Sequence, residues 1–362
     1  MIDRIIFTCG GTAGHVNPAI AVAQELQRRN PQVELLFVGA HRGLERELIA
    51  KAGYAFEAVN ISSFHRSLKP REIRHNLISL GNLIRAPREA KAILKRFQPQ
   101  MVIGTGGYAC YPMVKAAFQA GLPTLIHESN LVPGLTTKML VPYASRVLVG
   151  FEACRSGYPD SAQVVVTGTP VRGDFFAMTK AQAKQALGLD ENRRLIVSFW
   201  GSLGARGMNE QMAQMLALEA AHQPFDHIHA TGQSSYDGFL SQVEALGVDL
   251  EAAPALQVKP YIHNMATVMA AADLVICRAG ASTLSELTAL GIPAILVPSP
   301  YVTNNHQEKN ARALEAGSVV LTEAESTPKG CFKPPAKYYM MTKPMPTWRR
   351  PWQPWGPETQ QS

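Results

Sequence analysis

The stretch between Asp273 and Asn310 combines groups that suit a nucleotide sugar. We expect a short apolar strand at Leu274–Cys277, which ends at small residues before a helix of about Ser282–Leu290. A helix that starts after small residues presents free backbone N–H groups at the positive end of its dipole, where a phosphate binds well. Glu286 lies one turn into this helix, and its carboxylate can accept hydrogen bonds from two ribose hydroxyls.

Taken alone, Glu286 is better explained as a solvated acid that stabilises its own helix. The chain then continues, however, through an expected strand at Ala294–Val297 into a Pro-rich loop that ends in Asn304-Asn305-His306-Gln307. The His-Gln pair after this loop favours the interpretation of Glu286 as a carboxylate that binds the ribose of a nucleotide. We therefore predict a nucleotide-sugar site in this stretch.

Three strand–glycine-loop–helix units indicate the fold class. The first consists of a strand at residues 4–9 and the glycine loop after it, and the others lie at Met101–Pro112 and Leu195–Met208. Glycines let the backbone turn tightly and approach an anion closely. One such loop is weak support for a site, because many doubly wound proteins use it for packing alone. Three in one chain predict an α/β protein with ligands at the ends of its strands.

A chain of 362 residues is too long for one comfortable core, so we expect two doubly wound halves. They join within Gly168–Arg172, near residue 170, and would face each other across a cleft. In the first half, Asn17 is expected to cap a helix that has Pro18 at its first position. Residues Ser67–Phe97 are expected to form one or two helices interrupted by Pro87.

The composition is that of an ordinary soluble globular protein, with 46% hydrophobic residues and a mean hydropathy of −0.04. No apolar run is long enough to span a bilayer, and the first residues lack the architecture of a signal peptide. The five cysteines are scattered and without CxxC spacing. We therefore expect reduced thiols in a cytoplasmic protein, not disulfides or a zinc site.

The net charge of +7 is unevenly distributed. Phe64–Phe97 holds nine lysines and arginines against two acids, interleaved with leucines and isoleucines. This local basic patch favours an anionic membrane surface as partner, and we expect no nucleic acid. The alternative is a basic helix that is only solvated. The tail at 328–362 is also basic, rich in Pro, Trp and Met, and without periodicity, so we expect it to be disordered.

The segments RAGASTLSEL and PSPYVTNNHQEKNA resemble the donor-binding region of glycosyltransferase family 28, and the resemblance runs from Ile2 to about Thr327. It implies a GT-B fold, with an N-terminal acceptor and membrane-side domain at 1–170 and a C-terminal UDP-sugar donor domain at 171–327. It also implies an inverting transfer in peptidoglycan synthesis, from UDP-N-acetylglucosamine to the 4-hydroxyl of undecaprenyl-diphospho-muramoyl-pentapeptide. The implied location is the cytoplasmic face of the bacterial inner membrane, where the protein would bind peripherally.

The resemblance also suggests candidates for catalysis. His15 can take the proton of the attacking hydroxyl, although a histidine at this junction can equally cap its own loop. Glu128 and Asn130 are rival candidates for the general base, unless they only hold their loop. Tyr108 is expected to orient the acceptor. No acidic pair resembles a metal-chelating DxD motif, so we expect no metal and no other cofactor.

The same resemblance assigns the binding residues. Ile262 would contact the uracil through its backbone, unless it is only a buried residue at a helix start. Arg172 at the hinge would neutralise charge on the diphosphate, unless it is only a surface arginine. The acceptor diphosphate is expected at Gly11, Gly14, Gly104, Gly106 and Gly107. The donor is expected at Thr12, Ala13, Gly14, Asn130, Arg172, Ser202, Ile262, Ala281, Ser282, Thr283, Leu284, Ser285, Glu286 and Gln307.

Two features depart from the family pattern. Trp200 stands where a glycine is usual in the loop before Ser202, and the tail stands in place of one or two amphipathic helices. Other functions therefore stay open: a UDP-sugar-binding protein with impaired turnover, a related transferase acting on another lipid, or a dinucleotide oxidoreductase. The last fits the first glycine loop but leaves RAGASTLSEL and NNHQ unexplained.

Overall fold

A computed structural model describes residues 2–41, 43–61, 85–201, 204–221, 223, 225–302, 305–315 and 317–327. Three predicted features lie partly or wholly outside these residues: Ser202, most of the basic segment Phe64–Phe97, and the tail 328–362. The chain divides into two compact units, which we call unit 1 (Met1–Gly173) and unit 2 (Asp174–Ser362).

The sheet of unit 1 has seven described strands: β1 (Arg4–Thr8), β2 (Glu34–Ala40), β3 (Ala55–Val59), β4 (Met101–Gly104), β5 (Thr124–Glu128), β6 (Arg146–Val149) and β7 (Val164–Val166). Their order is β3-β2-β1-β4-β5-β6-β7, and every neighbouring pair is parallel. The order reverses between β1 and β4, and ligands of doubly wound sheets bind at the strand ends beside such a reversal.

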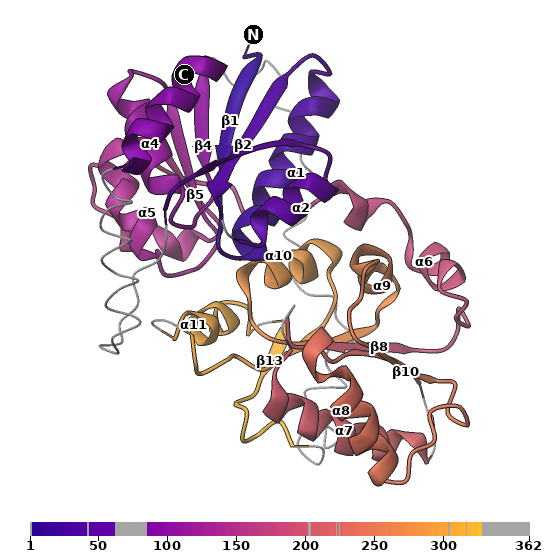
Figure 1. Ribbon diagram of the computed structural model, residues 1–362. Helices are drawn as coiled ribbons and strands as arrows, with labels where there is room; N and C mark the ends of the chain where they lie inside the picture. Colours follow the sequence, from indigo (N-terminus) through magenta and orange to yellow (C-terminus); the bar gives the residue numbers. More distant parts are fainter. Residues whose placement is uncertain are drawn as a thin grey trace, which may run out of the picture. The chain divides into compact units, whose positions relative to one another are not determined.

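Helices cover both faces of this sheet (Figure 1). They are α1 (Ala13–Arg29), α2 (Glu45–Lys51), α4 (Cys110–Gln119) and α5 (Leu135–Leu140), and residues 85–97 are also helical. Successive residues of a strand face opposite sides of its sheet. Accordingly, Phe7 packs with apolar residues of α1 and α2, whereas Ile6 packs with those of α4 and of the helix at 85–97.

The start of α1 corrects the prediction made for Asn17 and Pro18. The helix begins at Ala13, after an extended Thr12, and Pro18 lies inside it. A proline near a helix start removes only its own N–H bond, and the buried ring of Pro18 packs with the apolar face of this 17-residue helix. As a consequence, His15 belongs to the first turn of α1.

Pro87 does not interrupt a helix, because the residues on both sides of it within 85–97 are helical. The apolar residues Ala90 and Ile93 are buried in the core of unit 1 and hold this helix against the sheet. The opposite face is basic and exposed, and it consists of Arg85, Arg88, Lys91, Lys95 and Arg96.

Unit 2 contains a second parallel sheet. Its described strands are β8 (Leu195–Phe199), β9 (Asp226–Ala230), β10 (Leu256–Lys259), β11 (Leu274–Cys277), β12 (Ala294–Leu296) and β13 (Ser318–Val320), in the order β10-β9-β8-β11-β12-β13. The helices are α6 (Lys180–Ala186), α7 (Arg206–Ala220), α8 (Tyr236–Ala245), α9 (Met265–Ala271), α10 (Ala281–Leu290) and α11 (His306–Arg312). Two doubly wound parallel sheets confirm the predicted fold class.

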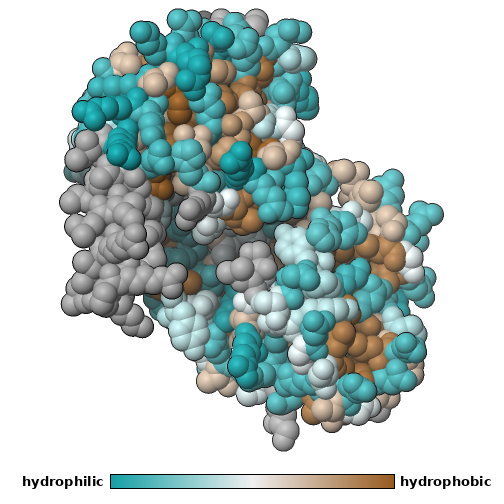
Figure 2. Space-filling model, viewed as in Figure 1, coloured by the Kyte–Doolittle hydropathy of each residue, from teal (hydrophilic) through white to brown (hydrophobic). Residues whose placement is uncertain are grey.

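The surface of the described residues is mostly hydrophilic in the view of Figure 2, with smaller hydrophobic areas between the polar ones. Within the described ranges, no helix has both the length and the apolar character that crossing a bilayer requires.

A chain of polar side chains runs through the core of unit 2. The Ser198 hydroxyl lies 2.8 Å from His227 Nε2 and 2.7 Å from His229 Nδ1, and His227 Nδ1 lies 2.7 Å from Glu219 Oε2. A Ser-His-Glu sequence of contacts also occurs in hydrolases. Here all four side chains are buried, so no substrate can reach Ser198, and the network serves the fold.

This network predicts that unit 2 loses stability in acid. Burial, and secondarily the neighbouring His227, lower the pKa of His229 to about 3, whereas an unfolded histidine titrates near about 6.5. The unfolded state therefore binds a proton that the folded state excludes. The contribution of neutral His229 to the free energy of unfolding is fully present above about pH 6.5. It decreases by about 1.4 kcal/mol per pH unit as the pH falls toward 3. Urea unfolding at several pH values should show a flatter acid dependence in His229→Gln, and an unchanged one in the control His263→Gln.

Candidate functional site

Two glycine loops of unit 1 meet at the ends of β1 and β4. The Gly10 N–H donates to the Gly106 carbonyl oxygen at 3.1 Å. A Cβ on Gly107 would lie 2.3 Å from the carbonyl oxygen of Gly10, so only glycine permits this approach. The loops that were predicted separately from the sequence thus form one structure at the reversal of the strand order.

His15 lies against this pair of loops. A Cβ on Gly106 would lie 2.4 Å from Cδ2 of the imidazole, so the ring sits directly on the Gly106 backbone. His15 Nδ1 donates a hydrogen bond to the Gly10 carbonyl oxygen at 2.8 Å, and Thr12 Oγ1 lies 3.4 Å from the same nitrogen. A carbonyl oxygen only accepts, so the neutral ring carries its proton on Nδ1. No hydrogen bond from the described part of the chain reaches Nε2, which is thus able to accept a proton.

Gly11 has its N–H directed into the protein. Its φ of +84° lies in the region that favours glycine, and its N–H donates to Glu45 Oε2 at 3.2 Å. An acceptor diphosphate near this loop would therefore need other N–H groups. Gly106 and Gly107 also have positive φ values, of +114° and +90°, and follow Gly104 at the end of β4.

Glu128, a rival candidate for the base, holds the loop that follows β5. Its Oε1 accepts hydrogen bonds from the backbone N–H and the side-chain amide of Asn130, both at 3.0 Å. Its Oε2 accepts from Gly134 N–H at 2.9 Å and from Thr137 Oγ1 at 2.7 Å. With four donors around a carboxylate that is 5% exposed, Glu128 fits the positioning of its loop better than proton transfer.

The remaining predicted residues of unit 1 lie near the same edge of the sheet. Thr12 precedes the first turn of α1, which contains Ala13 and Gly14 and has no side-chain cap. Tyr108 is 49% exposed on the loop between β4 and α4, where it is accessible to a ligand. Arg172 follows β7 at the end of unit 1.

Unit 2 has a cavity of about 570 Å³ beside the start of α7. This volume lies within the range of small-molecule sites. The first turn of α7 has no side-chain cap, so its N–H groups suit a diphosphate. The lining includes Gly201, Gly204, Ala205, Arg278, Ser299 and the predicted donor residue Gln307.

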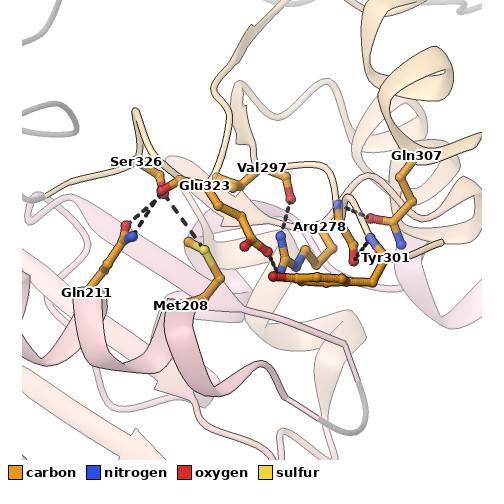
Figure 3. Close-up of polar contacts among 9 residues, drawn as sticks. Met208, Gln211, Arg278, Val297, Tyr301, Gln307, Glu323 and Ser326 are labelled. Atoms are coloured by element: carbon orange, nitrogen blue, oxygen red, sulfur yellow. Dashed lines mark hydrogen bonds and ion pairs between the residues drawn. The ribbon is translucent and has the colours of Figure 1, made fainter. Parts of the chain in front are cut away.

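Arg278 forms one wall of this cavity and connects three segments (Figure 3). Its guanidinium donates to the Val297 carbonyl oxygen at 3.1 Å and to Glu323 Oε1 at 2.5 Å. Its Cζ lies 5.9 Å from the centre of the Trp200 ring. Trp200, the departure from the family pattern, is buried and thus becomes a support for Arg278.

The segment after β13 is fixed to α7. Gln211 Nε2 donates to the Glu323 carbonyl oxygen at 2.9 Å, and Ser326 Oγ donates to Gln211 Oε1 at 2.8 Å (Figure 3). Through the Glu323 carboxylate, this segment also reaches the cavity wall. The described part of the chain after β13 is therefore part of the site's framework.

The other residues predicted to bind the sugar donor lie in three places of unit 2. Gln307 is held by its Oε1, which accepts from the Ser299 N–H at 2.9 Å. The side chain of Ile262 is buried, which fits both a backbone contact with the uracil and the alternative of a buried residue at a helix start. The first six residues of α10 carry the rest of the predicted set: Ala281, Ser282, Thr283, Leu284, Ser285 and Glu286.

Glu286 lies close to the end of β11. Burial raises the pKa of the Cys277 thiol, and the nearby Glu286 carboxylate raises it further. Glu286 is half-buried within α10, and its contact with the ribose stays a prediction. In the described ranges, no group of three or more His, Cys, Asp or Glu residues is arranged to hold a metal ion.

The sequence reasoning missed Glu45, Glu323 and a role for Arg278. Glu45 lies in GLE, a few residues after β2, and the nearby glycines Gly39 and Gly43 were the available signal. Arg278 is the first residue of RAGASTLSEL, but the sequence assigns it no role of its own. No signal in the sequence connects it with Glu323, 45 residues later.

Comparison with known proteins gives a consistent result. The chain matches the glycosyltransferase family 28 N-terminal domain over residues 5–149 and the C-terminal domain of the same family over residues 195–332. It is 41% identical over 327 residues to a UDP-N-acetylglucosamine--N-acetylmuramyl-(pentapeptide) pyrophosphoryl-undecaprenol N-acetylglucosamine transferase of Acetivibrio thermocellus, covering 90% of this chain and 86% of the relative. A protein of the same description from Desulforudis audaxviator is 44% identical, with 88% and 84% covered.

The chain is also similar in structure to solved proteins. The crystal structure of Acinetobacter baumannii MurG aligns with a TM-score of 0.68 and 26% identity, covering 94% of this chain and 91% of that one. A UDP-GlcNAc 2-epimerase from Neisseria meningitidis bound to UDP-GlcNAc aligns with a TM-score of 0.61 over 94% of both chains. At 15% identity, the epimerase shows a shared fold alone.

Proposed function

The chain belongs to glycosyltransferase family 28, and from that premise we propose that it transfers N-acetylglucosamine from UDP-N-acetylglucosamine to the 4-hydroxyl of undecaprenyl-diphospho-muramoyl-pentapeptide. The observation that carries this proposal is an identity of 41–44% along about nine tenths of the chain to relatives described by that reaction. This similarity also argues against a dinucleotide oxidoreductase.

The geometry supports an assignment of the proton transfer. His15 Nε2 takes the proton of the acceptor 4-hydroxyl while the oxygen attacks C1 of the sugar. The bond from C1 to the diphosphate oxygen breaks, and UDP leaves with the electron pair. Attack on the face opposite the leaving group inverts the configuration at C1. Support comes from the Nδ1 bond to Gly10, which leaves Nε2 as the accepting nitrogen.

The donor is assigned mainly to residues of unit 2, and the set predicted from the family resemblance also includes Thr12, Ala13, Gly14, Asn130 and Arg172. Residues at the start of α7 line the cavity, and the uncapped N–H groups of this first turn suit the diphosphate, whose charge grows as UDP leaves. Arg172 adds a positive charge. Glu286 accepts hydrogen bonds from the ribose hydroxyls, and Ile262 contacts the uracil through its backbone. Gln307 forms a hydrogen bond with the sugar. The acceptor diphosphate is assigned to the Gly104–Gly107 loop and to Gly14.

A transfer assay tests this proposal. The purified chain is incubated with radiolabelled UDP-N-acetylglucosamine and the undecaprenyl-linked muramoyl-pentapeptide, and the labelled lipid is isolated. Transfer to this acceptor is expected, and UDP but not NAD should bind in a calorimetric titration. Binding of UDP-N-acetylglucosamine without transfer would leave a UDP-sugar-binding protein. Transfer only to another lipid would identify a related transferase.

The acceptor is lipid-linked, so we place the protein peripherally at the cytoplasmic face of the inner membrane. Support comes from the exposed basic face of residues 85–97. Binding to vesicles that contain phosphatidylglycerol should weaken as salt is added, because exposed charges are screened. Reversal of Arg85, Arg88 and Lys91 to Glu should lower vesicle affinity by about 100-fold or more, at roughly 1 kcal/mol for each basic residue lost.

A double reversal at Arg28 and Arg29 provides the matched control. Both arginines are exposed on α1 and already paired with Glu25, so their loss should change vesicle affinity much less. Co-sedimentation with vesicles measures both variants. Equal binding to neutral and to anionic vesicles would make the basic face a solvated surface only.

A further inference from the structure

We propose that Glu45 is a positioning residue that acts on His15 through the peptide group between Gly10 and Gly11. The inference rests on the proposed role of His15 as the base. It adds a residue that lies outside the predicted set and that touches neither substrate in the proposed reaction.

The three groups form a continuous hydrogen-bonded chain. Glu45 Oε2 accepts from the Gly11 N–H at 3.2 Å. The carbonyl of the same peptide group, that of Gly10, accepts from His15 Nδ1 at 2.8 Å. The order is thus carboxylate, peptide, imidazole, with each donor directed toward the carboxylate end.

The position of the carboxylate is fixed from several sides. Glu45 Oε1 accepts from the N–H of Ala40, at the end of β2, at 3.1 Å. A Cβ on Gly10 would lie 2.8 Å from Oε1, and one on Gly43 would lie 2.1 Å from Oε2. A Cβ on Gly39 would lie 2.8 Å from Cγ of the same side chain. Glu45 is 1% exposed, so these glycines provide the space for a buried carboxylate.

This arrangement determines which ring nitrogen of His15 is free. A carboxylate that accepts from one end of a peptide polarises the group and makes its carbonyl oxygen a better acceptor. The Gly10 oxygen then favours the tautomer with the proton on Nδ1, and Nε2 stays available for the acceptor hydroxyl. In hydrolases a carboxylate orients the histidine by direct contact. Here one peptide group is interposed.

The test compares Glu45→Gln with wild type in protein labelled with ¹⁵N-histidine. The resonance of His15 is assigned by its loss in His15→Gln, and ¹⁵N chemical shifts at alkaline pH report the tautomer. We expect the Nδ1–H form in wild type and a shift toward the Nε2–H form in Glu45→Gln. We also expect kcat to fall by about 10- to 100-fold, with KM for UDP-N-acetylglucosamine nearly unchanged.

Two further variants make the test specific. Glu89→Gln is the matched control, because Glu89 is a carboxylate of unit 1 that accepts from the Asn60 N–H and has no bond to either glycine loop. It should leave the His15 tautomer unchanged. Gly43→Ala places a methyl group against Oε2 and displaces the carboxylate without removing it, so it should reproduce the tautomer shift even if Glu45→Gln does not fold.

An unchanged tautomer in folded Glu45→Gln and Gly43→Ala would overturn the inference, whatever happens to activity. A tautomer shift in both, together with full turnover in His15→Ala, would support the contact with His15 and reject only the assignment of the base. The two proposals can thus fail separately.

Discussion

Replacement of His15 by alanine is expected to lower kcat by about 10²- to 10⁴-fold, while the affinity for UDP-N-acetylglucosamine barely changes. A general base acts on the attacking hydroxyl only as the bond to C1 forms, so its loss affects the chemical step and not donor binding. Steady-state kinetics with the lipid-linked acceptor, combined with calorimetric titration of the donor, separates the two effects.

Gln27→Ala is a suitable control for this prediction, because Gln27 is exposed near the far end of the same helix, α1. It should leave kcat near the wild-type value. Near-normal turnover in His15→Ala would move the base to Glu128 or to solvent. Glu128 is the weaker candidate, since its two oxygens already accept four hydrogen bonds from its own loop.

The second large effect is expected at the donor. Glu286→Ala should weaken recognition of UDP-N-acetylglucosamine by roughly 2–4 kcal/mol, because two ribose hydroxyls lose a charged acceptor on binding. This corresponds to about 30- to 1,000-fold in kcat/KM for the donor. The measurement is kcat/KM for UDP-N-acetylglucosamine at saturating acceptor, with thermal unfolding recorded for the same variant.

The alternative role of Glu286, as an acid that stabilises α10, gives the opposite pattern. It would lower the Tm and leave donor kinetics unchanged. Glu244→Ala provides a comparison, since Glu244 is an exposed acid of α8 outside the cavity lining. Equal kinetics for Glu286→Ala and Glu244→Ala would contradict the ribose contact.

The predicted strands agree closely with the structure because buried parallel strands have a strong local signal. The strand expected at Leu274–Cys277 has the bounds that the structure gives, and the one expected at Ala294–Val297 ends one residue earlier, at Leu296. Continuous apolar runs between glycines and prolines leave few alternatives. The start of α1 was wrong because local capping rules place Pro18 at a helix start. Packing of α1 on the sheet outweighs that preference and extends the helix back to Ala13.

The sequence by itself determined the kind of protein and supplied most of the candidate site residues. Glycine loops after apolar strands, and the segments around Glu286 and Gln307, are local patterns whose chemistry can be read directly. The order of the strands, and hence the meeting of the two glycine loops, depends on which strands pair across the sheet. No local pattern carries that information.

Only the tertiary structure decided how the site residues are supported. Glu45 reaches His15 through a peptide group 34 residues earlier in the chain, and Glu323 reaches Arg278 across 45 residues. Both carboxylates look in sequence like ordinary surface acids. Glu45 is buried among glycines and Glu323 is partly buried beside a guanidinium that lies over an indole ring, so each has a defined partner. Such partners arise when the chain folds, because a buried charge is stable only where hydrogen bonds from distant segments converge on it.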